Sequence, residues 1–412
     1  MSAKYILLKN VRLLDALEPV DVLIDGKTIG CVGAGISAED AELVDCNGNL
    51  LLGSFVDCHT HLDKAFMETP RSATCLMDAV MLTMDYQKSI PNVQIRADVQ
   101  RRGRKMLDLE IQHGSGIVRS HVSVDDIWGM EAFYASCELR SLYADKLELQ
   151  LSVPYMEAYA GAWAEAARAG EIDYIAGYPT ISRNPRASVD QLFALAEQFG
   201  LPLDLHVDES DAPNIDCFEY VLKKTIESGM QGKVNCSHVT ALAAVTQKKA
   251  DAAISLCRCA DVSIISLPSC NMFLMGREDR GLVRRGITRI RDLLDAGVNV
   301  AIASDNIRDP FRPFGNADML EEALFTCQVL SDGSDTGMRQ VLHMVTDSAA
   351  CASGKNKNRN SNNFSDSVTP GGFANLVLLN KSCLKQAIIE GAVPRLVIKN
   401  GGIVFEKEGV DK

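Results

Sequence analysis

Apolar, β-rich runs recur along the middle of this sequence, and stretches with helix-like patterns separate them. Stretches such as "SVDQLFALAEQFG" end at a glycine, as helices commonly do. The apolar runs are nearly continuous, which is typical of parallel strands buried on both faces. Eight such runs can be distinguished: "GSFVDCHTHLD" (53–63), "GSGIVRSHVSV" (114–124), "LELQLSVPYMEA" (147–158), "IDYIAGYPTI" (172–181), "LPLDLHVDE" (201–209), "KVNCSHVTAL" (233–242), "DVSIISLPSCN" (261–271) and "VNVAIASDN" (298–306). This alternation predicts an α/β fold, a (β/α)8 TIM-type barrel.

An open, doubly wound sheet is the alternative fold for alternating strands and helices. That fold commonly carries a GxGxxG motif after its first strand, and this sequence has none there. A chain of 412 residues that is 47% hydrophobic can form a large core with a satellite domain. The barrel therefore remains the predicted architecture.

Short strand-like segments with hairpin turns occur at both ends of the chain. The pairs Asp25-Gly26 and Asn400-Gly401 are typical turn dipeptides between such strands. We expect a small composite β-sandwich domain from residues 1–52 and 371–412, and a barrel domain from residues 53–352. The polar, Asn/Ser-rich segment 353–370 is expected to be an exposed, mobile loop between them, with a functional lid as the alternative.

Charge and composition exclude several classes of partner. The formal net charge of -12 repels polyanions, so nucleic acids and acidic membranes are not expected partners. No apolar run reaches the length needed to cross a bilayer, and the N-terminal segment does not resemble a signal peptide. Thirteen scattered cysteines without a CxxC pair indicate reduced thiols. We expect a cytoplasmic protein that binds a small molecule. Whether it forms a homo-oligomer stays open.

Histidines gather near the carboxyl ends of the predicted strands. Five of the seven lie there: His59, His61, His121, His206 and His238. In a barrel this rim carries the catalytic groups. Because side chains at i and i+2 of a strand share one face, the histidine pair of "HTHLD" (59–63) is expected to point together into the barrel mouth. Core histidines that bond to the backbone are the alternative.

Two further polar groups close apolar strands and complete a set of metal ligands. His206 ends "LDLH" and Asp305 ends "AIASD". A buried carboxylate is costly unless it is paired or coordinated. Three imidazoles, from His59, His61 and His206, together with Asp305 suit one Zn²⁺ or Fe²⁺ ion. Capping of a following helix is the alternative for Asp305. The fourth predicted strand has no lysine that could bridge two metals, which favours a single ion.

Residues beside these ligands are candidates for catalysis. A metal would lower the pKa of a bound water toward neutrality. Glu209, three residues after His206, is placed to move protons to a ring nitrogen and to a leaving amine. His238 can stabilise charge that develops on oxygen. A solvated loop acid is the alternative for Glu209.

These motifs resemble the amidohydrolase superfamily, and within it the cytosine deaminase-like branch. The resemblance covers nearly the whole chain, and the HxxE of "HVDE" is a mark of the deaminases. It implies a (β/α)8 barrel with one divalent metal, ligands His59, His61, His206 and Asp305, and catalytic roles for Glu209, His238 and Asp305. The matching segments are "HTHLD" (59–63), "HVDE" (206–209), "SHVTAL" (237–242), "RRGITRIRDLLDAGVNV" (284–300) and "SDNIRDPFRPFGNADML" (304–320).

The substrate-binding positions depart from the branch pattern. Met156 stands where cytosine deaminases have a glutamine, Asn306 where they have a second aspartate, and Phe311 where they have a tryptophan. A thioether cannot replace an amide that pairs with a pyrimidine edge. "SDNIRDP" is also similar to N-isopropylammelide isopropylaminohydrolase, a triazine-degrading relative. We therefore predict a deaminase of an amino-substituted nitrogen heterocycle. A hydrolase of a cyclic amide or an N-alkylamino ring is the alternative, and a scaffold protein without activity is the remote one.

Overall fold

The computed structural model describes residues 5–277, 279–281, 283–355 and 368–407. Within these ranges, eight parallel strands form one sheet in the order of the chain. A bridge between Thr60 and Asp305 brings the first strand to the end of the last one, and the Asp305 amide donates to the carbonyl of His59 at 2.9 Å. The strands are β6 (Phe55–Thr60), β7 (Ser115–His121), β8 (Glu148–Pro154), β9 (Tyr174–Gly177), β10 (Leu203–Val207), β11 (Val234–His238), β12 (Ser263–Ser266) and β13 (Val300–Ile302). The predicted barrel is confirmed.

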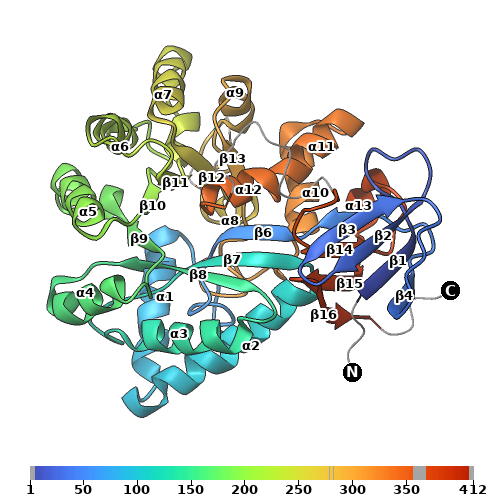
Figure 1. Ribbon diagram of the computed structural model, residues 1–412. Coiled ribbons are helices and arrows are strands. Elements are labelled where there is room, and N and C mark those ends of the chain that lie inside the picture. Colours follow the sequence, from blue (N-terminus) through green and yellow to red (C-terminus); the bar gives the residue numbers. More distant parts are fainter. Residues whose placement is uncertain (1–4, 278, 282, 356–367, 408–412) are drawn as a thin grey trace.

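Helices cover the outside of this sheet (Figure 1). Helix α5 shows how the sequence sets their ends: the Asn184 side chain accepts from the amide of Ala187, Pro185 begins the helix, and Gly200 ends it with φ 69°. The surrounding helices are α2 (Ile95–Gln112), α3 (Glu131–Tyr143), α4 (Ala160–Arg168), α5 (Pro185–Phe199), α6 (Asp216–Glu227), α7 (Gln247–Ala260), α9 (Ile290–Asp295), α10 (Met319–Leu330), α11 (Asp335–Met344) and α12 (Asp347–Ala352).

Two smaller sheets lie together at one side of the barrel (Figure 1). One has the order β3-β2-β1-β4 and the other β16-β15-β14-β5, and side chains such as Leu8 and Ile398 share one core between them. Strand β5 joins the two ends of the chain because it pairs antiparallel with β14. The bounds are β1 (Tyr5–Val11), β2 (Val20–Asp25), β3 (Thr28–Gly33), β4 (Ala41–Asp45), β5 (Leu51–Gly53), β14 (Leu376–Leu379), β15 (Pro394–Lys399) and β16 (Gly402–Glu406), and a short helix, α13 (Leu384–Ile389), follows β14.

The predicted small sandwich from both termini is thus confirmed as part of the fold. The proposed domain boundaries at residues 52, 352 and 370 stay predictions. The loop expected at 353–370 falls mostly outside the described residues. No helix in the described ranges is both long enough and apolar enough to span a membrane.

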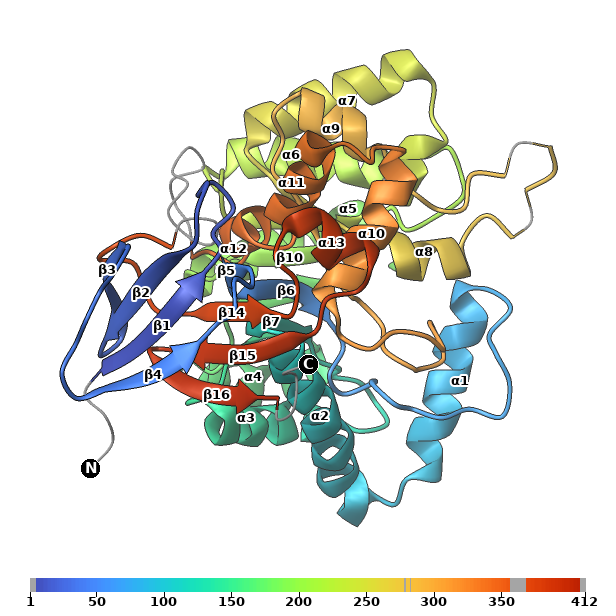
Figure 2. The same ribbon diagram turned by 90° about the vertical axis from the view of Figure 1, so that its right-hand side faces the viewer.

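Two more helices stand at the end of the barrel away from the terminal sheets, α1 (Leu76–Ser89) and α8 (Pro268–Leu274) (Figure 2). They pack on each other through a small apolar cluster that includes Ala79 and Leu82 of α1 and Cys270 and Leu274 of α8. This cluster fixes α1 above the carboxyl ends of the barrel strands, where the histidines lie.

Candidate metal centre and active site

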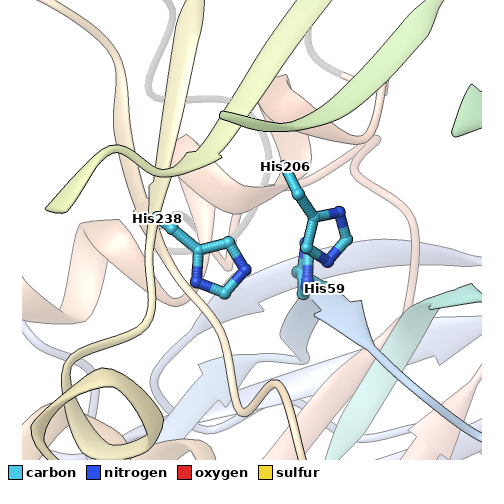
Figure 3. Close-up of side chains that lie close together, drawn as sticks. All are labelled: His59, His206 and His238. Atoms are coloured by element: carbon cyan, nitrogen blue, oxygen red, sulfur yellow. The ribbon is translucent and has the colours of Figure 1, made fainter. Parts of the chain in front are cut away.

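The predicted metal ligands meet at the carboxyl ends of β6, β10 and β13. His61 Nε2 lies 3.2 Å from Asp305 Oδ1, and His59 Nε2 lies 3.7 Å from the same oxygen. The ring of His206 is 4.7 Å from the ring of His59, between centroids. His238, from the end of β11, is 4.9 Å from His206 by the same measure. Figure 3 shows His59, His206 and His238 converging from their separate strands.

The unpaired polar atoms of this cluster fit a metal ion. Both ring nitrogens of His59, Nδ1 of His206 and both carboxylate oxygens of Asp305 are buried without a hydrogen-bonding partner. Buried polar atoms in proteins are nearly always satisfied. Groups of three possible ligand atoms lie within 4.8 Å of one another, among them His59, His61 and Asp305. The buried histidine and aspartate cluster can therefore hold a metal ion.

Protonation states agree with this interpretation. Burial holds the pKa of His59 and His206 well below the ordinary value, and burial together with the Lys64 charge lowers the pKa of His61 to about 4. Burial would raise the pKa of Asp305, but the neighbouring imidazoles of His61 and His238 outweigh it, so that this pKa is about 2. Near neutral pH the imidazoles are neutral and the carboxylate is ionised, which are the forms that bind divalent metals.

The backbone at the strand ends takes a conformation that side chains usually avoid. Asp305, His238 and Val239 have φ values of 59°, 67° and 48°. Positive φ costs a residue other than glycine about 1–3 kcal/mol, and the cost is highest for a β-branched residue such as valine. Such strain is common at functional sites. Here it turns the chain sharply, directly after strands β11 and β13. The helix cap considered for Asp305 is wrong, because the next helix, α10, begins after Asp318.

Glu209, His238 and Asn271 form a group of polar contacts beside the cluster of potential metal ligands, which is called the metal cluster below. Glu209 Oε1 lies 3.2 Å from His238 Nδ1 and accepts a 2.9 Å hydrogen bond from Asn271 Nδ2. The Asn271 amide also lies within 3.2 Å of His238 Nδ1. Burial raises the pKa of Glu209, although His238 and Asn271 oppose this. Glu209 is therefore no solvated loop acid.

A polar layer under the cluster was not assigned from the sequence. The ring centroid of His121, on β7, lies 4.2 Å from that of His59 with the two rings tilted by 40°, and His121 Nε2 lies 3.3 Å from Asp204 Oδ2. Arg119 pairs with the same oxygen at 2.9 Å, and all three side chains are fully buried. The sequence signal was an arginine inside the apolar run "GSGIVRSHVSV". A buried arginine needs a partner, and only the folded barrel reveals Asp204 as that partner.

A cavity of about 430 Å³ opens over the metal cluster. All three predicted substrate contacts, Met156, Asn306 and Phe311, line it. The Asn306 amide is held in place because its Nδ2 donates to Asp309 Oδ2 at 2.6 Å, and burial raises the pKa of Asp309 to about 7. Lys64, which sequence reasoning also missed, lines the cavity with its Nζ 3.2 Å from His61 Nδ1. The roles of the predicted contacts stay predictions.

The two remaining histidines, His113 and His343, lie outside the cluster. His113 Nδ1 is 3.3 Å from a carboxylate oxygen of Asp318, and His343 Nδ1 is 2.9 Å from one of Asp347. Both occur at the ends of helices, α2 and α11. Neither reaches the barrel mouth.

Comparisons with known proteins agree with the fold. The sequence pattern of the Amidohydrolase family matches residues 142–405. N-isopropylammelide isopropyl amidohydrolase of Pseudomonas sp. (strain ADP) is 28% identical over 98% of both chains. Pterin deaminase of Rhizobium rhizogenes is 28% identical over 95% of this chain and 89% of that one. The crystal structure of 5-methylcytosine deaminase from Klebsiella pneumoniae with 5-fluorocytosine covers 98% of both chains with 26% identity and a TM-score of 0.87.

This chain belongs to the amidohydrolase family, and it is a hydrolase. Its resemblance to the cytosine deaminase-like branch is confirmed by the 5-methylcytosine deaminase structure. Its resemblance to N-isopropylammelide isopropylaminohydrolase is confirmed as well. The crystal structure of that enzyme from Burkholderia multivorans has a TM-score of 0.82 and 25% identity, over 97% of this chain and 98% of that one.

Proposed function

We propose that the protein is a hydrolytic deaminase of an amino-substituted nitrogen heterocycle and works with one divalent metal ion. The observation that carries this proposal is Glu209, whose side chain is only 14% exposed and lies beside His238 at the edge of the cluster of potential metal ligands. A carboxyl group in that place can serve proton transfer to a ring. Two of the similar proteins are themselves named as deaminases of pterin and of 5-methylcytosine.

The reaction consumes one water and releases one ammonia. The water oxygen bonds to the ring carbon that bears the amino group, and the adjacent ring nitrogen takes up a proton. The bond between that carbon and the amino nitrogen then breaks, and ammonia leaves with a further proton. The ring keeps a carbonyl in place of the amine. A Zn²⁺ or Fe²⁺ ion held by His59, His61, His206 and Asp305 would supply the nucleophile by lowering the pKa of water toward neutrality.

The residues at the cavity divide the proton transfers. Glu209, with its pKa raised by burial, carries a proton to the ring nitrogen and then to the leaving amine. The ionised Asp305 accepts one proton from the attacking water and returns it as ammonia leaves, so that the two protons of the water end on the ring nitrogen and on the amine. His238 Nε2 is buried without a hydrogen-bonding partner in the described structure and can hold the incoming oxygen. Glu209 thus serves the ring nitrogen and the leaving amine, whereas Asp305 and His238 serve the attacking water.

Substrate recognition falls to Met156, Asn306 and Phe311, which line the cavity. Phe311 offers an apolar surface to a ring and Asn306 offers an amide. Met156 cannot pair with a pyrimidine edge, which argues against cytosine itself. We further propose a cytoplasmic enzyme that binds a small heterocycle and has no nucleic acid or membrane partner.

A second candidate is hydrolysis of an N-alkylamino heterocycle. The observations that favour it are the neighbours Asp305-Asn306 and the 28% identity to N-isopropylammelide isopropyl amidohydrolase over 98% of both chains. Glu209 favours loss of ammonia over loss of an alkylamine.

Two measurements test these proposals. Elemental analysis of the purified protein should find about one metal ion per chain; a protein without stoichiometric metal would be a scaffold. A screen of pyrimidines, purines, triazines, pterins and creatinine-like rings should then release ammonia from at least one class. Release of an alkylamine without any ammonia would overturn the deaminase proposal in favour of the second candidate.

A further inference from the structure

The cavity over the metal cluster is larger than a single ring requires. Its volume of about 430 Å³ lies in the range of roughly 300 to 1,000 Å³ that is typical of pockets for drug-sized ligands. His238, Glu209 and Asp305 line this cavity together with residues of α1, and Glu209 Oε1 lies 3.2 Å from His238 Nδ1. A small heterocycle bound against these three polar groups would leave the remainder of the cavity open.

One face of α1 forms part of the cavity wall. Leu76, Met77, Val80, Met84 and Gln87 line it, and their spacing of one, three, four and three residues places them on a single helical stripe. Ile127 and Ile181 line the cavity as well. The wall formed by α1 is apolar apart from Gln87 and Thr83.

Two methionines of this stripe remain accessible in the structure. Met77 is 55% exposed and Met84 is 39% exposed, although both belong to a cavity wall. Covering apolar surface of this kind is worth about 25 cal/mol per Å². Methionine is flexible and polarisable, so it adapts to apolar groups of different shapes. The wall is therefore suited to an apolar ligand group.

Helix α1 is held in place at both ends, so this wall is a fixed one. Before the helix, Arg71 donates twice to Asp78, at 2.6 Å each. Near its end, Gln87 Nε2 donates to Asp125 at 2.7 Å, and the indole of Trp128 donates to the Gln87 carbonyl at 3.1 Å. A pre-organised wall adds affinity because little conformational freedom is lost on binding.

We propose that the substrate carries an apolar substituent of several carbon atoms on the side of the ring opposite the hydrolysed bond, and that the α1 stripe binds this substituent. The inference rests on the proposed function, since it orients the ring by the group that leaves. The occupant of the stripe is the substrate because the stripe and the metal cluster line one continuous cavity. The substrate class is thus an alkyl- or aryl-substituted aminoheterocycle.

A substituent series tests this directly. The probes are 5-substituted isocytosines and 1-substituted cytosines that carry hydrogen, ethyl, butyl or phenyl, positions that lie opposite the amino-bearing carbon. Ammonia release should give a kcat/KM that rises roughly fourfold for each methylene buried, up to butyl. The matching 5- and 1-substituted uracils cannot lose ammonia, and calorimetry should show the same trend in their affinity.

Helix α1 also provides a matched control. The double variant Met77→Gln/Met84→Gln keeps side-chain length and makes the stripe polar, so the dependence on substituent length should flatten. Met81 is on the same helix and is 55% exposed, like Met77, but it does not line the cavity in the described structure. Met81→Gln should therefore leave the dependence unchanged.

The outcomes separate this inference from the proposed function. Ammonia release at equal kcat/KM across the series would overturn the inference and leave the deaminase proposal standing. Uracil binding that depends on substituent length, without any ammonia release, would overturn the deaminase proposal and leave the apolar subsite on α1 standing. A protein that neither turns over nor discriminates the series overturns both. Dimerisation that weakens in the double variant, with no substituent effect, would assign the stripe to a second copy and overturn the inference.

Discussion

The carboxyl group of Glu209 lies where two neighbours fix its position, because His238 and Asn271 both contact its Oε1 atom. Its predicted task is proton transfer, and it is not among the expected metal ligands. Replacing Glu209 should therefore lower turnover without loss of the metal. Such effects can be tested with single substitutions, because each substitution removes one proton donor or one hydrogen bond.

The variant Glu209→Gln should keep stoichiometric metal and lower kcat about 10²- to 10⁴-fold, the usual contribution of general acid and base catalysis. Metal content by elemental analysis and ammonia release by a coupled assay check this. Glu157→Gln, at an exposed acid just beyond β8, is the control and should retain turnover. Unimpaired turnover in Glu209→Gln would remove Glu209 from the mechanism.

Asn271 should act through Glu209 without touching the substrate. Asn271→Leu keeps the volume and removes the hydrogen bond to the Glu209 carboxyl. That bond stabilises the ionised form and so lowers the pKa of Glu209; its loss should raise this pKa. In the pH profile of kcat, the alkaline limb should therefore move to higher pH, and kcat itself should fall about tenfold. An unmoved limb with a lower melting temperature would indicate a merely structural asparagine.

The barrel strands are the elements that the sequence predicts well, because each is a short apolar run between turn signals. Helix α1 is the element that the pattern does not reveal. Its residues are apolar on two sides, since Ala79 and Leu82 pack against α8 while Met77 and Met84 face the cavity. A helix with two apolar faces lacks the single stripe on which periodicity depends. The sequence also did not predict that α1 lies above the site.

The contact between α2 and β6 contains two buried acids. Glu110 of α2 and Asp57 of β6 are both fully buried, and burial raises the pKa of each, with that of Glu110 well above its ordinary value. Asp57 accepts hydrogen bonds from the amide and the hydroxyl of Ser304, next to Asp305. The pair therefore links a surrounding helix to the point where the barrel closes.

This pair predicts a pH dependence of stability. A carboxyl group whose folded pKa is raised stabilises the fold below its unfolded pKa, and this contribution is lost as the pH rises through the folded pKa. The wild-type melting temperature should therefore fall as the pH rises above 4.5, the ordinary pKa of a glutamate, and pH 6 and pH 9 are two points at which to compare it. Glu110→Gln cannot ionise, so its melting temperature should fall less over the same interval. Scanning calorimetry at both pH values checks this, and equal falls in the two proteins would contradict it.

At the scale of the whole molecule, the sequence predicted where the site lies better than how it works. Histidines at the strand ends indicated where the potential metal ligands gather, because strand order in a barrel brings all carboxyl ends to one rim. The partners of those residues could not be predicted in the same way. Asn271 and Asp204 reach Glu209 and His121 from strands or helices far away in the chain. Such pairs depend on the register of the closed sheet, which local patterns do not determine.

The proposed ligand set would also give a metal ion a role in holding the barrel closed. His59 and His61 come from β6 and the residue after it, His206 from β10, and Asp305 from the segment after β13, which closes on β6. A ligand that binds only the folded state stabilises it by about 4 kcal/mol at a thousand times its Kd. For a chain of 412 residues, this corresponds to a rise in melting temperature on the order of 5 °C.

Removal of the metal with a chelator should therefore lower the melting temperature by several degrees, and added Zn²⁺ should restore it. In His59→Ala the chelator should have little further effect, because one ligand of the cluster is already lost. In His343→Ala, which changes a histidine of α11 outside the cluster, the full shift should persist. Differential scanning calorimetry with and without chelator measures all three proteins. A wild-type melting temperature that the chelator leaves unchanged would show that these strand ends are held together without a metal, and the ligand assignment would then be wrong.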